Sequence, residues 1–195
     1  MSLADKLADN YTYKDYLSWP EDERWEIIDG EAYSMSPAPS RMHQKLSSIL
    51  SGEIYQFLKK KKTSCEVYAA PFDVKFPVGK ERDEDITTVV QPDISVVCDL
   101  KRLDEKGCKG APDLIIEILS PATGAKDMKM KFQLYEKHGV REYWLVLPEE
   151  RSVMIFNLKD GEYGKPEIFT FEDELFSRVL EGLKLDLKEL FEDVV

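Results

Sequence analysis

Two short runs of branched apolar residues constrain the fold more than any other feature of this chain. Ile94–Cys98 and Leu114–Leu119 are almost continuously apolar, and each run follows a Pro-Asp pair. Short apolar runs without polar alternation are typical of strands that are buried on both faces. Such strands need helices on both sides of their sheet. The sequence therefore predicts an α/β or mixed α+β fold, in which helices flank a mixed sheet.

Apolar periodicity places the other elements around these strands. From Ser40 a 3.6-residue apolar stripe predicts a long helix that ends in the lysine run 59–62, and a second helix is expected to end at His138, before Gly139. The Asp29-Gly30 pair predicts a hairpin between two short strands. The remaining predicted elements are a short helix over 12–19, strands over 65–70, 72–76, 141–147 and 152–158, and a final helical turn after Asp186.

Length and composition favour one soluble domain. With 195 residues, 43% of them apolar, we expect a single domain over 1–195, with residues 1–11 as a loosely ordered extension. No apolar stretch approaches the ~18 residues of a membrane span, and the first 19 residues do not resemble a signal peptide. We therefore expect a cytoplasmic protein. Its three cysteines are widely spaced and form no CxxC pair, so we interpret them as free thiols.

The net charge of −11 argues against loose electrostatic binding to nucleic acid, but the charge is uneven along the chain. Residues 41–62 carry six basic residues against one acidic residue, and residues 124–141 carry five against two. One interpretation is that these are solvated helix faces. The other is a locally basic site on an acidic protein, and both interpretations stay open.

A carboxylate inside a predicted central strand is the first candidate functional residue. Glu117 lies within the apolar run 114–119, where an isolated charge costs several kcal/mol to bury. It is either a paired core residue or a ligand. Asp93 opens the neighbouring predicted strand, and carboxylates on adjacent strands can share a divalent cation. With only two histidines in the chain, we expect a hard metal such as Mg²⁺ or Mn²⁺.

Three further side chains have both a structural and a functional interpretation. Lys131 falls in the middle of the buried stripe of the second long helix, where it either pairs with Asp127 or reaches the Glu117 site. His43 lies at the edge of the first long helix's stripe, as a boundary residue or a general base. The same two interpretations hold for Glu31, which follows the Asp29-Gly30 turn.

Five motifs in series resemble the Uma family of the PD-(D/E)xK restriction-endonuclease-like superfamily, over residues 12 to 192. They are WEIIDGE (25–31), MHQ (42–44), QPDISVV (91–97), PDLIIEILSP (112–121) and KFQLYEKHGVREYW (131–144). The resemblance implies a restriction-endonuclease-like core. It also implies a DNA endonuclease, a hydrolase that cuts phosphodiester bonds and requires Mg²⁺ or Mn²⁺.

The resemblance also implies roles for individual residues. Leu119 occupies the position of the superfamily's usual E-x-K lysine, so Lys131 would take over that catalytic role. The implied catalytic residues are Asp93, Glu117 and Lys131, the implied metal ligands are Asp93, Glu117 and the carbonyl of Ile118, and the auxiliary residues are Glu31 and His43.

A second hypothesis comes from another functional class. The chain could be a catalytically inactive nuclease-fold protein that acts as a binding or assembly module, with Lys131 and Glu117 as a buried ion pair. For the nuclease hypothesis, we expect DNA binding that is weak and salt-sensitive, because the chain is acidic overall. A two-fold homodimer would suit an enzyme that cuts both strands.

Overall fold

The main sheet is mixed, as the sequence predicts. The computed structural model describes residues 10–20, 23–35, 39–120 and 125–192. The main sheet runs in the order β11-β10-β9-β8-β6-β3, and β12 also pairs with β10. Strands β8 and β9 are parallel, whereas β6 is antiparallel to both β8 and β3. The bounds are β3 Glu66–Ala69, β6 Ile94–Val97, β8 Leu114–Ile118, β9 Glu142–Leu147, β10 Ser152–Lys159, β11 Glu162–Tyr163 and β12 Glu167–Thr170.

A second sheet stands beside the first and was not predicted as a separate unit. Its order is β2-β1-β5-β4-β7. The predicted hairpin forms its edge, and both residues of the turn, Asp29 and Gly30, have positive φ angles of 48° and 81°. Two of its strands are too short to leave a periodic pattern. The bounds are β1 Trp25–Ile28, β2 Glu31–Ser34, β4 Asp73–Lys75, β5 Val89–Val90 and β7 Gly107–Lys109.

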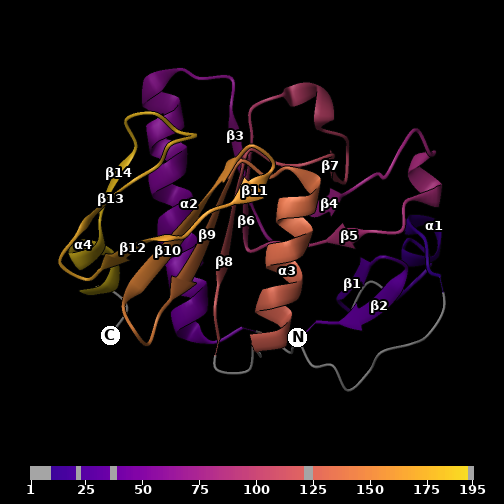
Figure 1. The fold of residues 1–195 in the computed structure, drawn as a ribbon, viewed down its shortest axis with the longest axis horizontal. Helices are drawn as coiled ribbons and strands as arrows, with labels where there is room; N and C mark the ends of the chain where they lie inside the picture. The colour runs from indigo at the N-terminus through magenta and orange to yellow at the C-terminus, as the bar shows by residue number, and fades with distance from the viewer. Residues whose placement is uncertain (1–9, 21–22, 36–38, 121–124, 193–195) are drawn as a thin grey trace.

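Two long helices cover opposite faces of the main sheet, as expected (Figure 1). Helix α2 spans Arg41–Lys61, and the hydroxyl of its N-cap Ser40 accepts a hydrogen bond from the His43 backbone N–H. Helix α3 spans Ala125–His138 and ends before Gly139, whose φ is 82°. The smaller elements are α1 Tyr13–Tyr16, β13 Glu174–Phe176, β14 Lys184–Asp186 and α4 Leu187–Glu192, with short 3₁₀ helices at Asp83–Asp85 and Leu100–Arg102.

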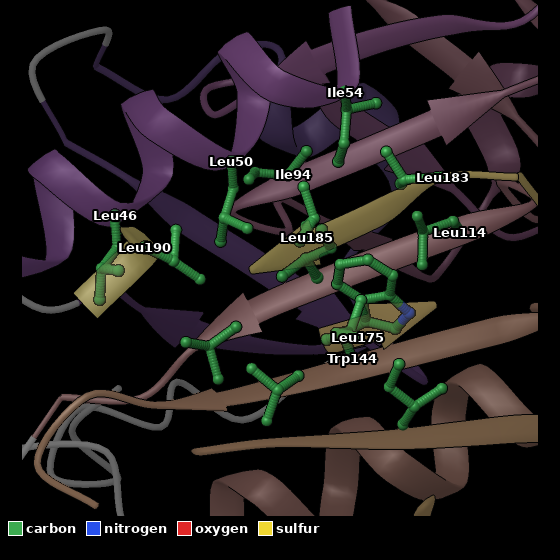
Figure 2. Close-up of a cluster of buried hydrophobic side chains, with 14 of the residues drawn as sticks. Leu46, Leu50, Ile54, Ile94, Leu114, Trp144, Leu175, Leu183, Leu185 and Leu190 are labelled. Carbon is green, nitrogen blue, oxygen red and sulfur yellow. The ribbon is translucent and has the colours of Figure 1, made fainter. Parts of the chain in front are cut away.

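Strand alternation divides the core into two layers and points Glu117 toward α3. Leu114, Ile116 and Ile118 of β8 belong to the apolar cluster that also holds the buried side chains of α2; Figure 2 labels Leu114 among the members of this cluster, with Leu46, Leu50 and Ile54 of α2. Ile115 faces the other way, into the cluster that holds α3 and the second sheet. Because side chains alternate along a strand, Glu117 shares the face of Ile115. The site described below therefore lies on the α3 side of the sheet.

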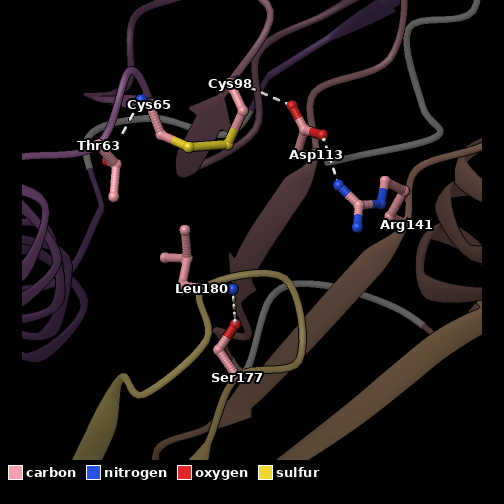
Figure 3. Close-up of a disulfide and its surroundings, with 7 residues drawn as sticks. All are labelled: Thr63, Cys65, Cys98, Asp113, Arg141, Ser177 and Leu180. Atoms are coloured by element: carbon pink, nitrogen blue, oxygen red, sulfur yellow. Dashed lines mark hydrogen bonds and ion pairs between the residues drawn. A yellow bond between two sulfur atoms is a disulfide. The ribbon is translucent and has the colours of Figure 1, made fainter. Parts of the chain in front are cut away.

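The cysteines correct one expectation. Cys65 and Cys98 form a disulfide, so the interpretation of all three cysteines as free thiols was wrong; only Cys108 is free, and it is buried (Figure 3). The pairing follows from strand register: Glu66 of β3 lies opposite Val97 of β6, and one step further places Cys65 opposite Cys98. Sequence spacing could not show this, because the two cysteines are 33 residues apart.

The N-terminal segment is described only in part. Residues 1–9 of the predicted extension lie outside the described residues. Tyr11 donates its backbone N–H to the Gly30 carbonyl at 2.8 Å and its ring contacts Trp19, so this end of the segment packs on the β1–β2 hairpin. Among the described residues, no helix has the length and apolar character needed to cross a membrane.

Candidate functional site

The two predicted acidic residues lie across from each other on neighbouring strands. Ile94 of β6 pairs with Ile116 of β8, and extending this antiparallel register by one residue places Asp93 opposite Glu117. Asp93 Oδ2 accepts the Ile118 backbone N–H at 2.8 Å and lies 3.1 Å from His43 Nε2 at the start of α2. The sheet and α2 thus hold Asp93 through one of its two oxygens.

Helix α3 brings Lys131 to Glu117. Lys131 Nζ donates to Glu117 Oε1 at 2.9 Å, and the Tyr135 hydroxyl donates to the same oxygen at 2.5 Å. Lys131 and Tyr135 are four residues apart, one turn of helix, and both are buried. The inward orientation predicted for Lys131 from the helical stripe is therefore observed, and its ammonium reaches the Glu117 strand.

Burial and neighbouring charges change the proton affinities in this site. Burial raises the pKa of Glu117 from 4.5 to about 7; the Lys131 ammonium opposes the change, and the charges of Asp93 and Glu26 add to it. Burial also keeps the pKa of Tyr135 well above its usual range, so its hydroxyl stays a donor. For His43, burial lowers the pKa, but the hydrogen bond and charge of Asp93 outweigh burial and leave it raised.

A second buried glutamate, which the sequence analysis missed, shares the Lys131 ammonium. Glu26 of β1 is 0% exposed, and its Oε1 accepts Lys131 Nζ at 3.1 Å and the Gln91 backbone N–H at 2.9 Å. Like Glu117, it is a carboxylate inside a short apolar strand, and that pattern could have identified it. The contact between Glu26 and Lys131 could not be predicted from the sequence, because the two residues are 105 positions apart.

Other residues considered from the sequence lie elsewhere. Glu31 accepts the Tyr33 hydroxyl at 2.6 Å, and within the described chain no hydrogen bond or ion pair joins it to Asp93 or Glu117. The second Pro-Asp motif has a structural role at the opposite end of β8. There Asp113 accepts the Cys98 backbone N–H at 2.8 Å and pairs with Arg141 at 3.0 Å (Figure 3).

The oxygen atoms of this site suit a hard divalent cation. Asp93 Oδ1 and Glu117 Oε2 receive no hydrogen bond from the residues that the structure describes, and their charges repel each other, as the raised pKa of Glu117 reflects. Two carboxylates and a backbone carbonyl are ligands that Mg²⁺ accepts with water in the remaining positions. No group of three or more Asp, Glu, His or Cys side chains among the described residues is arranged to hold a metal. A cation here would therefore depend on the two carboxylates.

A small cavity opens beside His43. It has a volume of about 160 Å³ and lies between the start of α2, the end of β8 and the turn after β9. His43 and Leu119 are among its lining residues, together with Glu149 and Glu150 of that turn. Within the described chain, the cavity is related to Asp93 only through His43, whose Nε2 lies 3.1 Å from Asp93 Oδ2.

Comparisons with known proteins agree with this architecture. The model of a family named Uma2, described as "Putative restriction endonuclease", matches residues 13–188. A protein of Synechocystis sp., "Uncharacterized protein slr1290", is 29% identical over 150 residues, which cover 75% of this chain and 74% of that protein. The crystal structure of "a putative nuclease belonging to DUF820" from Anabaena variabilis is similar with a TM-score of 0.75 and 23% identity, covering 95% of this chain and 99% of that one. This last likeness shows the fold alone.

The raised pKa of Glu117 predicts a pH dependence of stability. In the unfolded chain Glu117 loses its proton above its ordinary pKa of 4.5, whereas in the folded protein it keeps the proton up to a pH of about 7. The free energy of unfolding of the metal-free protein should therefore fall as the pH rises from 4.5 through about 7. The Glu117→Gln variant has no titrating carboxyl group at this position. Its free energy of unfolding minus that of wild type should therefore increase from pH 4.5 to about 7. Urea denaturation at pH 4.5, 6, 7 and 8 with EDTA measures the difference. A difference that is constant with pH, or that changes in favour of wild type, contradicts the prediction.

Proposed function

The chain belongs to the Uma2 family, and from this premise we propose that it is a metal-dependent DNA endonuclease that hydrolyses phosphodiester bonds. The observation that carries the proposal is the convergence of Asp93 from the loop before β6, Glu117 from β8 and Lys131 from α3. The description of the matching family, "Putative restriction endonuclease", supports this class of activity, and the Anabaena structure supports the fold.

Asp93, Glu117 and the Ile118 carbonyl are the proposed metal ligands. A bound divalent cation would polarise the scissile phosphate and lower the pKa of a water molecule. The protein orients its ligands in advance: the Ile118 N–H and His43 both contact Asp93 Oδ2, which leaves Oδ1 available. Tyr135 and Lys131 likewise both contact Glu117 Oε1, which leaves Oε2 available.

Lys131 is the residue that we propose supplies positive charge in the reaction. Its ammonium stands beside Glu117, where it can orient the attacking water or stabilise the negative charge that develops on the phosphoryl oxygens. One preorganised donor at such a position is worth ~3–4 kcal/mol of transition-state stabilisation. Leu119 holds the position of the usual E-x-K lysine, so the helix α3 lysine supplies this charge instead. Glu31 and His43 are the proposed auxiliary residues; Glu31 accepts the Tyr33 hydroxyl at 2.6 Å, and His43 Nε2 lies 3.1 Å from Asp93 Oδ2.

The proposed substrate is DNA, bound weakly and in a salt-sensitive way, and the proposed assembly is a homodimer. Most of the basic residues of 41–62 and 124–141 belong to α2 and α3, the two helices that supply His43 and Lys131, although Lys59, Lys60 and Lys61 lie in the last turn of α2 and His43 in its first. These helices offer local positive charge on a protein whose net charge is −11. Sequence-independent affinity away from the site should therefore be low.

One observation favours a second candidate function, that of a catalytically inactive binding or assembly module. Lys131 forms ion pairs with both Glu117 and Glu26, so these charges are already paired without a cation. In an inactive protein this buried network would need no metal. The two candidates therefore differ in whether Mg²⁺ binds and stabilises the folded protein.

Metal binding separates the two candidates, and the chain offers a matched control in its second Pro-Asp motif. We expect calorimetry to detect Mg²⁺ or Mn²⁺ binding to wild type, and we expect saturating metal to raise the Tm. Asp93→Asn should abolish both effects, because it removes one of two carboxylate ligands. Asp113→Asn should retain both, since Asp113 bonds to Cys98 and Arg141 at the far end of β8. Wild-type binding no tighter than that of Asp93→Asn would contradict the nuclease proposal and favour the inactive module.

Plasmid nicking tests the proposed role of Lys131. Lys131→Arg keeps a positive charge beside the two buried carboxylates, so the protein should fold, but the guanidinium places its donors differently. We expect its rate of supercoiled-plasmid nicking in Mg²⁺ to fall by about 100-fold, the usual scale for a displaced electrostatic group. Circular dichroism confirms folding. Nicking by Lys131→Arg and by Lys131→Ala at the wild-type rate would exclude Lys131 from the reaction.

A further inference from the structure

The buried glutamate of β1 connects two parts of the site that are distant in sequence. We propose that Glu26 is a positioning residue, whose Oε1 joins the loop that carries Asp93 to the helix that carries Lys131. The proposal rests on the proposed nuclease function. Glu26 is 0% exposed, so it acts through its neighbours and not by contact with DNA.

The first connection is to the loop before β6. The Gln91 backbone N–H donates to Glu26 Oε1 at 2.9 Å, and Gln91 stands two residues before Asp93. The intervening residue is Pro92, whose ring restricts its φ angle. A shift of the Gln91 backbone would therefore be passed on to Asp93, with little freedom in between to absorb it.

The Gln91 side chain is fixed as well, from the side of the second sheet. Its amide nitrogen donates to Asp73 Oδ1 and to the Tyr16 hydroxyl, both at 2.9 Å. Its amide oxygen accepts from the Arg24 guanidinium at 2.9 and 3.1 Å. The orientation of the Gln91 N–H toward Glu26 is thus set by a network that lies outside the proposed active site.

The second connection is to Lys131. Its ammonium donates to Glu26 Oε1 at 3.1 Å and to Glu117 Oε1 at 2.9 Å, so the lysine is held between two carboxylates on different sheets. A long lysine side chain that pairs with one carboxylate can pivot about it. Two acceptors on different strands define the direction of the ammonium much more closely.

A purely structural role makes a different prediction, and the chain contains a matched control for it. Glu142 of β9 is also 0% exposed, and it accepts hydrogen bonds from Trp144 Nε1 and from the backbone N–H groups of Arg178 and Val179. Within the part of the chain that the structure describes, no hydrogen bond or ion pair joins the Glu142 carboxylate to Asp93, Glu117 or Lys131. Glu142→Gln therefore measures what the loss of a buried, hydrogen-bonded carboxylate does to folding alone.

The test compares Glu26→Gln with Glu142→Gln in single-turnover cleavage of plasmid DNA with Mg²⁺. We expect Glu26→Gln to lower the cleavage rate at saturating DNA by about tenfold or more, and to leave the DNA Kd within about threefold of wild type. Glu142→Gln should change the Tm and leave the cleavage rate at the wild-type value. In a Lys131→Arg background, Glu26→Gln should cause a much smaller further loss, because both changes act through the same ammonium.

Each other outcome overturns the inference in a recognisable way. If wild type cuts and Glu26→Gln cuts equally well, Glu26 has no positioning role and the nuclease proposal stands. If Glu26→Gln and Glu142→Gln lose the same activity, the effect is general destabilisation. If Glu26→Gln does not fold, Glu26→Asp replaces it in the test, because it keeps the negative charge but moves the carboxylate by one methylene. Cleavage by Glu26→Asp at the wild-type rate would overturn the inference. If wild type itself does not cut, the nuclease proposal fails first.

Discussion

The buried charge of Glu117 in the central strand is the interaction on which the rest of the site depends. A carboxylate at this depth needs partners, and the structure supplies two on helix α3, Lys131 and Tyr135. This requirement fixes how α3 must rotate about its axis. It also explains why a lysine occupies the middle of an otherwise apolar stripe, and why a second carboxylate, Glu26, can be buried on the other side of the same ammonium.

Much of the architecture could be predicted from the sequence because its elements carry local signals. The apolar stripe of α2, the Asp-Gly turn and the buried runs of β6 and β8 each depend on neighbours within a few residues. The orientation of Lys131 also followed from a single helix. Whether Lys131 reaches Glu117 or pairs with Asp127 stayed open in the sequence, because the face of β8 that turns toward α3 is known only from the structure.

The features that could not be predicted depend on register between elements that are distant in sequence. The disulfide follows from the pairing of β3 with β6, and the role of Glu26 follows from the contact between the second sheet and α3. Strands β5 and β7 are two and three residues long, too short for periodicity to be visible. The auxiliary role predicted for Glu31 stays a prediction; among its contacts is a hydrogen bond from the Tyr33 hydroxyl.

The net charge of −11 does not exclude DNA binding, because some of the acidic side chains are buried. Glu26, Glu117, Glu142 and Asp73 are all buried and hydrogen-bonded, so these four carboxylates do not lie on the surface that an approaching DNA molecule would contact. Lys131 of α3 belongs to this buried set, whereas Arg41 and Lys45 of α2 and Lys129 and Lys137 of α3 are exposed. An acidic protein can in this way present a local site for an anionic substrate.

The central claim is that Asp93 and Glu117 together hold a divalent cation. Crystals grown with Mn²⁺ and measured at the manganese absorption edge test it most directly. The account predicts an anomalous peak between Asp93 and Glu117, within coordination distance of both carboxylates. An anomalous map with no peak at these two carboxylates, at a Mn²⁺ concentration that supports plasmid nicking, would contradict it.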